Sequence, residues 1–236
     1  MVPAMDGIPA YIALYLMFVF STTCHEAAHA FVAQRGGDDT AYSLGHVTLD
    51  PMPHIVRSPW GMVIAPVIGI FTMGWPLGWA SVPYDPYWGQ RHPLRRSAMS
   101  LAGPAANFLI ALVAVVCLRV MIETGVYHLS GTGVHVGLVY LSDGVPANAP
   151  VAAVAYLLSH LLMLNLLLGL FNLMPFPPLD GSSVLEGLSP RGLGSLYDRL
   201  REIPGHELLG WIAASQLFRY LRDPMAHVIA LGLGFI

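Results

Sequence analysis

Charged residues are scarce in this chain, and lysine is missing altogether. Charged residues make up 11% of the 236 residues and hydrophobic residues 55%, whereas an ordinary soluble domain has roughly 25% charged residues. All 11 basic residues are arginine and the net charge is −3, so no basic cluster indicates nucleic acid as a partner. The composition indicates an integral membrane protein in contact with the lipid bilayer and argues against a soluble domain.

Cysteine is also rare, which argues against a disulfide-stabilised fold. The two cysteines, Cys24 and Cys117, both lie in apolar stretches. We therefore interpret each as a small buried hydrophobe rather than as half of a disulfide.

Long apolar runs, in contrast, are abundant. Residues 10–33, 60–80, 98–120 and 151–173 are each near the length of about 20 residues that crosses a bilayer. The first run is expected to be a retained membrane helix rather than a cleaved signal, because Asp6 and no Lys or Arg precedes it. The tail, 207–236, is apolar but interrupted by charges, and a short span, a hairpin and an interfacial helix are alternatives for it.

These runs predict an all-α integral membrane protein, a polytopic bundle of transmembrane helices. We expect one domain over residues 1–236, with core motifs in 10–187 and a C-terminal amphipathic or membrane segment in 188–236. Residues 42–49 alternate loosely and are rich in Val, Thr and Tyr, which predicts a short strand or hairpin at the membrane surface.

The sequence His-Glu-Ala-Ala-His at residues 25–29 lies inside the first apolar run. A charged group at the centre of a membrane helix costs about 2.5 to 3.5 kcal/mol, so this cluster requires a reason. Positions i and i+4 of a helix share one face, so His25 and His29 can both bind one zinc ion, while Glu26 faces a water molecule at the metal. This spacing is typical of metalloproteases that carry their general base in the same motif.

The run at 60–80 contains several prolines and glycines that interrupt a helix. We expect it to be re-entrant, entering and leaving on one side, because His29 and Asp180 then reach the same face. The loop 122–150 contains no Arg, whereas most arginines then share the other side, which the positive-inside rule assigns to the cytoplasm. These arginines are Arg35, Arg57, Arg91, Arg95, Arg96, Arg191, Arg199 and Arg201.

A catalytic zinc site usually has three protein ligands and one open position, so the two histidines require a partner. Asp180 is the best candidate, because Pro175, Pro177 and Pro178 forbid helical continuation and leave an extended stretch just before it. An N-cap role for Asp180 in a following helix is the alternative.

Several motifs, in order, resemble those of site-2 proteases, which are intramembrane zinc metalloproteases. The motif at 25–29 is similar to the HExxH of that family. Residues 102–108 (AGPAANF) resemble its AGPxxN helix, and residues 172–181 (NLMPFPPLDG) resemble its NxxPxxxLDG segment. Residues 45–51 (GHVTLDP) and His54 partly match a GxVTLxP strand and a following histidine of compact members. His46, Asp50 and Ser182 depart from the family pattern, and no PDZ-like or CBS-like module accompanies the core.

The resemblance implies roles for individual residues. His25, His29 and Asp180 would bind Zn²⁺, and Glu26 would act as the base. Asn107 and Asn172 would contact the substrate backbone or polarise the scissile carbonyl, although helix-to-helix hydrogen bonding is an alternative for both. His54 is either a group near the metal or substrate, or a histidine on a surface loop.

The function expected from these residues is hydrolysis of peptide bonds in membrane-protein substrates, within or near the bilayer of a bacterial or archaeal cell membrane. A catalytically inactive scaffold and a metal-binding or transport protein are the alternatives. The scaffold is disfavoured because all three ligands and the base are present, and a transporter would need ligands distributed along several spans. The sequence does not identify the substrate, and it leaves a homo-oligomer open.

Overall fold

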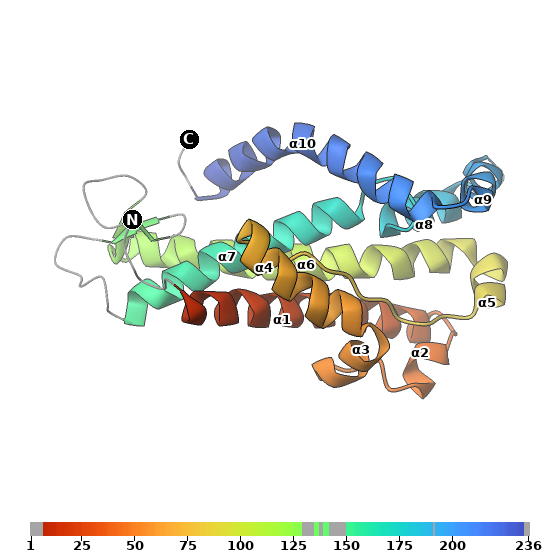
Figure 1. The fold of residues 1–236 in the computed structure, drawn as a ribbon, viewed down its shortest axis with the longest axis horizontal. Helices are drawn as coiled ribbons and strands as arrows, with labels where there is room; N and C mark the ends of the chain where they lie inside the picture. The colour runs from red at the N-terminus through yellow and green to blue at the C-terminus, as the bar shows by residue number, and fades with distance from the viewer. Residues whose placement is uncertain (1–6, 129–134, 137–138, 142–149, 191, 234–236) are drawn as a thin grey trace.

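The computed structural model describes residues 7–128, 135–136, 139–141, 150–190 and 192–233, and it shows an elongated bundle of long helices (Figure 1). Three helices in these residues are long and apolar enough to cross a membrane: α1 (Ile8–Arg35), α6 (Pro93–Glu123) and α7 (Pro150–Asn172). They run along the long axis of the bundle, and α6 packs against both of the others. The fold class predicted from composition, an all-α membrane protein, is confirmed.

Small side chains allow the central helices to approach closely. Ala111 and Ala114 of α6 face Ala152 and Ala155 of α7 in one cluster of fully buried residues. Alanine is common at helix interfaces in membranes, where dispersion contacts between closely packed helices replace the hydrophobic driving force. This packing places the amide side chains of α6 and α7 within reach of each other.

The segment 60–80 folds back on itself. After α3 (Pro51–Arg57), the chain bends by 112° into the π-helical turn η1 (Trp60–Ile64) and α4 (Ala65–Met73). Gly74 ends α4 with φ 72°, a left-handed conformation that favours glycine. The chain then returns, and the Trp79 N–H donates to the Gly61 carbonyl at 3.1 Å. Residue 79 therefore lies beside residue 61, at the end from which the hairpin began.

The strand predicted over residues 42–49 is not formed. Thr40–Ser43 is a helical turn, α2, and residues 44–49 are turns and bends. The Asp38 carboxylate accepts hydrogen bonds from Thr40, and the His46 N–H donates to the Ala41 carbonyl at 2.9 Å. These bonds are local rather than to a neighbouring strand, and α2 packs on α1. The loose alternation of Val, Thr and Tyr was therefore a misleading signal.

A small sheet forms elsewhere, in the connection between α6 and α7. Strands β1 (Tyr127–His128), β2 (His135–Val136) and β3 (Val139–Leu141) pair antiparallel in the order β1-β3-β2. The sheet lies at the opposite end of the bundle from α5 (Pro86–Arg91) (Figure 1). The remaining parts of loop 122–150, namely 129–134, 137–138 and 142–149, lie outside the described residues.

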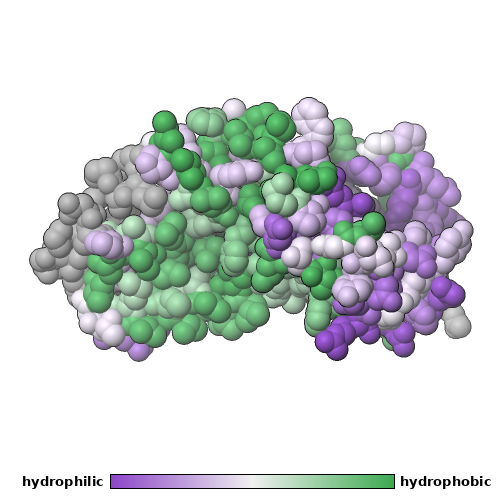
Figure 2. Space-filling view, turned by 90° about the horizontal axis from the view of Figure 1, so that it is seen from below, coloured by the Kyte–Doolittle hydropathy of each residue, from purple (hydrophilic) through white to green (hydrophobic). Residues whose placement is uncertain are grey.

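The surface divides into a hydrophobic belt and a hydrophilic end (Figure 2). The C-terminus of α1, the N-terminus of α6, α5, α8 (Asp180–Leu188) and α9 (Leu193–Glu202) gather at one end of the bundle (Figure 1). Arg191 lies outside the described residues. These elements carry Arg35, Arg91, Arg95, Arg96, Arg199 and Arg201.

The tail is one long helix, α10 (His206–Leu233). It is therefore not a hairpin of two helices, and a membrane span and an interfacial helix remain the alternatives. Near its start, the Trp211 ring lies 5.2 Å from that of Phe171 at the end of α7 and 6.4 Å from that of Trp79 on the returning chain. Ala214 joins a buried cluster with Met174 and Leu179. This helix thus packs on the segment that leads to Asp180.

A carboxylate joins three helices at the hydrophilic end. Glu186 of α8, 7% exposed, pairs with Arg96 of α6 at 2.8 Å and with Arg201 of α9. Burial alone would raise the pKa of the Glu186 carboxyl, but hydrogen bonds from Arg201 and Arg96 hold that pKa below its usual value. The ion pairs therefore stabilise the fold above the ordinary glutamate pKa of about 4.3. The stabilisation is lost as pH falls through the lower, folded-state value.

Replacing Glu186 with glutamine is expected to lower the free energy of unfolding at pH 7 by about 2 to 3 kcal/mol. This value lies below the usual range for a broken buried pair because the Arg201 side chain is 35% exposed. Thermal unfolding in detergent between pH 7 and pH 3 measures the effect. The variant should also lose less stability than the wild type as pH falls below about 4.3.

The matched control is Glu123→Gln, which removes a carboxylate from an exposed pair with Arg119 on α6. Its unfolding free energy should stay within about 0.5 kcal/mol of wild type. Identical pH profiles for Glu186→Gln and Glu123→Gln would contradict the assignment.

Candidate metal centre

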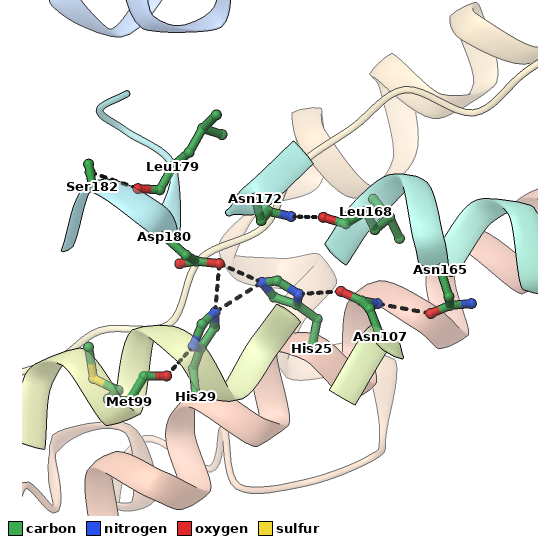
Figure 3. Close-up of polar contacts among 10 residues, drawn as sticks. All are labelled: His25, His29, Met99, Asn107, Asn165, Leu168, Asn172, Leu179, Asp180 and Ser182. Atoms are coloured by element: carbon green, nitrogen blue, oxygen red, sulfur yellow. Dashed lines mark hydrogen bonds and ion pairs between the residues drawn. The ribbon is translucent and has the colours of Figure 1, made fainter. Parts of the chain in front are cut away.

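Three side chains that are far apart in the sequence converge on one point (Figure 3). The Nε2 atoms of His25 and His29 on α1 lie 2.9 Å apart, and the Oδ2 atom of Asp180 lies 3.1 Å and 3.3 Å from them. Two ligands at about 2.0 to 2.1 Å from a tetrahedral zinc lie roughly 3.3 Å apart. The three atoms are therefore spaced as the protein ligands of one such ion.

The hydrogen bonds at Nδ1 of each imidazole ring decide whether Nε2, which faces the point of convergence, carries a proton or a lone pair. His25 Nδ1 lies 2.6 Å from Asn107 Oδ1, and His29 Nδ1 lies 2.7 Å from the Met99 carbonyl oxygen. Both oxygens accept, so both Nδ1 atoms carry the proton of the neutral ring. Each Nε2 atom then directs its lone pair at the other and at the Asp180 carboxylate. Such an arrangement is repulsive unless a cation lies between the three atoms, so the donor set fits a metal ion.

Gly103 of α6 leaves room for this cluster. A Cβ at residue 103 would collide with His25 Nε2 and His29 Nε2. The sequence indicated only that a small residue here permits close helix packing. The structure shows that the missing side chain borders the space between the ligand nitrogens.

Asp180 reaches the cluster as the first residue of α8, after a connection of turns and bends over residues 173–179 that follows α7. The N-cap position belongs to Leu179, and no side-chain cap bond is present there, so the N-cap alternative for Asp180 is wrong. The prolines before it leave backbone carbonyls for other partners: Tyr197 of α9 donates to the Pro175 carbonyl at 3.1 Å. This hydrogen bond anchors the proline-rich stretch to α9.

Glu26 and His54 lie next to the cluster. The Glu26 side chain is buried in α1, 4% exposed, within electrostatic range of His25, His29, Asp180 and His54. His54 is 0% exposed on α3 and donates from Nε2 to the Thr48 carbonyl at 3.2 Å. Full burial excludes the alternative of a surface-loop histidine.

The two asparagines expected to contact substrate occupy different environments. Asn107 on α6 is 0% exposed, and both ends of its amide are used: Oδ1 faces His25, and Nδ2 donates to Asn165 Oδ1 at 2.9 Å. Asn172 ends α7 on the Asp180 side of the cluster (Figure 3), where its Nδ2 donates to the Leu168 carbonyl at 2.9 Å. Only Asn172 is partly exposed.

Asn165 of α7 was missed by the sequence interpretation. It is 0% exposed and bonded to Asn107. Two signals could have indicated it, because an amide in an apolar helix requires a partner and its spacing of seven from Asn172 places both on one helix face.

Replacing Gly103 with alanine is expected to weaken zinc binding roughly tenfold or more, because the new methyl group enters the space between the ligand nitrogens. Zinc affinity in a chelator competition measures the effect. Gly194→Ala is the matched control, since a Cβ on that glycine of α9 meets nothing within 4 Å. Zinc affinity of Gly103→Ala equal to that of the wild type would show that the metal does not lie between these nitrogens.

Comparison with known proteins agrees with this chemistry. The model of Peptidase family M50 matches residues 13–202. A Bacillus subtilis protein named “Putative zinc metalloprotease YwhC” is 33% identical over 181 residues, which cover 76% of this chain and 70% of that protein. A Mycobacterium tuberculosis protein named “Putative zinc metalloprotease Rip2” is 31% identical over 234 residues, which cover 94% of this chain and 79% of that protein.

No solved structure matches the chain. The family model nevertheless covers most of the sequence, including His25, Glu26, His29 and Asp180. Zinc is the metal of this family and of its named relatives. With α1, α6 and α7 suited to cross a membrane, the chain is a multi-pass membrane protein that belongs to Peptidase family M50, the site-2 protease family.

Proposed function

We propose that this protein is an intramembrane zinc metalloprotease that hydrolyses peptide bonds of membrane-protein substrates within or near the bilayer. The observation that carries the proposal is the convergence of His25, His29 and Asp180 beside the buried carboxylate of Glu26. Both histidines lie on α1, a helix that is long and apolar enough to span the membrane. Water and a peptide bond must therefore meet below the membrane surface.

His25 Nε2, His29 Nε2 and Asp180 Oδ2 are the atoms that would hold the zinc ion. Bound zinc would supply Lewis acidity, which makes water a nucleophile near neutral pH and polarises a carbonyl oxygen. Glu26 then accepts the proton of the attacking water and returns it to the leaving amine, so one carboxylate serves as base and acid in turn. Its position one residue from His25 supports this role.

Asn172 is the proposed contact for the substrate backbone. It is partly exposed on the Asp180 side of the cluster, at the end of α7 (Figure 3). An amide can donate to a carbonyl and accept from a peptide N–H, which suits an extended substrate. Asn107 is better suited to orient His25, because both ends of its amide are already bonded inside the protein. His54, buried near Glu26, is proposed to shape the charge around the base.

In the proposed orientation, the metal-binding end of the bundle faces the cytoplasmic side of the membrane. The support is the group of arginines on α1, α5, α6 and α9 at the hydrophilic end, as the positive-inside rule expects. The hairpin 60–80 is proposed to be re-entrant from the same side, because residue 79 returns to residue 61. Residues 1–236 then act as one domain, with α10 packed on the segment that precedes Asp180.

Replacing Glu26 with glutamine is expected to lower the cleavage rate roughly a hundredfold to ten-thousandfold, the usual contribution of a general base. Zinc content should stay at the wild-type level, because Glu26 is not one of the three converging ligands. Cleavage of a transmembrane model peptide in vesicles, measured together with zinc per protein, tests both statements.

Glu123→Gln serves as the matched control for that assay, since the same substitution at an exposed site leaves the metal cluster intact. Cleavage by Glu26→Gln at the wild-type rate would refute the mechanism. Zinc flux across the vesicles without any cleavage by the wild type would favour transport instead.

Replacement of a single ligand provides a separate test. His25→Ala and Asp180→Ala are each expected to purify without zinc, because each removes one of three converging donor atoms. Asp198→Ala on α9 is the control, since that carboxylate is 72% exposed and pairs with Arg201 at 3.6 Å. Full zinc retention by Asp180→Ala would remove this residue from the site.

A further inference from the structure

Asn165 is the meeting point of three helices. Its Nδ2 donates to the Leu161 carbonyl of its own helix at 2.9 Å and to Ser21 Oγ of α1 at 2.9 Å. Its Oδ1 accepts from Asn107 Nδ2 of α6 at 2.9 Å. The side chain is 0% exposed, so none of these bonds is exchanged readily with water. Asn165 itself does not touch the metal ligands.

The direction of the chain of bonds is fixed at one end. A backbone carbonyl only accepts, so the Leu161 carbonyl requires the NH₂ group of Asn165 on its side. Oδ1 of Asn165 must then face Asn107 and accept from its NH₂ group. The carbonyl end of Asn107 is thereby directed at His25 Nδ1 (Figure 3). Each amide leaves the next only one orientation.

The last bond decides the tautomer of His25. An oxygen at Nδ1 requires the proton on Nδ1, which leaves the Nε2 lone pair free for the metal. If the Asn107 amide turned over, its NH₂ group would face Nδ1, and the ring would carry its proton on Nε2 instead. Asn107 Oδ1 would then face Asn165 Oδ1, two buried acceptors without a donor between them, which is unfavourable.

The second histidine has no such requirement. His29 Nδ1 donates directly to the Met99 carbonyl at 2.7 Å, and a backbone carbonyl in a helix cannot turn over. His25, in contrast, depends on a side-chain amide that can. A further residue is therefore required to hold that amide in one orientation.

We propose that Asn165 is a positioning residue for the zinc site, which holds the Asn107 amide in the orientation that keeps the Nε2 lone pair of His25 available. This inference depends on one part of the proposed function, namely that the bound metal is zinc. Asn165 on α7 thereby affects metal affinity through Asn107, which contacts His25, without binding the metal itself. Outer hydrogen bonds of this kind contribute roughly tenfold to a hundredfold to metal affinity.

The test compares zinc affinities in a chelator competition without substrate, so it is independent of cleavage. Asn165→Leu should bind zinc roughly tenfold to a hundredfold more weakly than the wild type. Thr72→Val is the control: it removes from α4 a hydroxyl that also donates to a carbonyl four residues earlier, and Thr72 is not one of the residues of the metal centre. Its zinc affinity should equal that of the wild type.

A rescue variant separates orientation from general stability. In Asn107→Asp/Asn165→Leu, the carboxylate accepts from His25 Nδ1 with either oxygen, so no neighbour is needed to orient it. Zinc affinity should return to within a few fold of wild type. If Asn165→Leu does not fold, Asn165→Ala replaces it, because it also removes the acceptor of the Asn107 NH₂ group while Asn107 stays in place, and the affinity loss should lie in the same range.

Two results would overturn the proposal. One is wild-type zinc affinity in Asn165→Leu. The other is an affinity loss that Asn107→Asp does not reverse, which would give Asn165 a purely structural role. A wild-type protein that binds zinc but cleaves nothing would refute the proposed function and leave this inference standing.

Discussion

Mutual repulsion among three lone-pair donors is the constraint on which the rest of this structure depends. Two imidazole nitrogens and a carboxylate oxygen lie within 3.3 Å of one another in a largely buried site. Their repulsion is strong at low dielectric, and only a cation converts it into attraction. The packing around them serves that end: α6 approaches at a glycine, α8 delivers the carboxylate, and the far side of each ring meets an acceptor.

Much of this site could be predicted from the sequence. The spacing of His25 and His29 fixes a shared helix face, and a charged motif in an apolar run required a functional reason. Asp180 followed from the prolines before it, because they exclude a helix and leave the chain free to cross beside α1. The long helices were equally readable from their length and hydropathy. The strand at 42–49 was wrong because Asp38 and Ala41 offer the backbone local hydrogen bonds, and no residue pattern shows that a neighbouring strand is missing.

The roles of Asn107, Asn165 and Gly103 could not be predicted, for a common physical reason. Each depends on which face of α6 or α7 meets α1, and that rotation is set by contacts between helices rather than by the residues of one helix. From the sequence, a buried amide side chain can only be predicted to require hydrogen-bond partners. Its partners, and the order in which they donate and accept, become visible once Leu161, Ser21 and His25 are placed around it.

The distance along the chain between the ligands has a consequence for folding. His25 and Asp180 are 155 residues apart in sequence, so an ion shared between them closes nearly the whole core into a single loop. Closing a loop of this length is entropically unfavourable, and the bond energy of the ion offsets that loss. A bound ion would therefore add to the stability of the tertiary structure, because it would tie α1 to the start of α8 across most of the core.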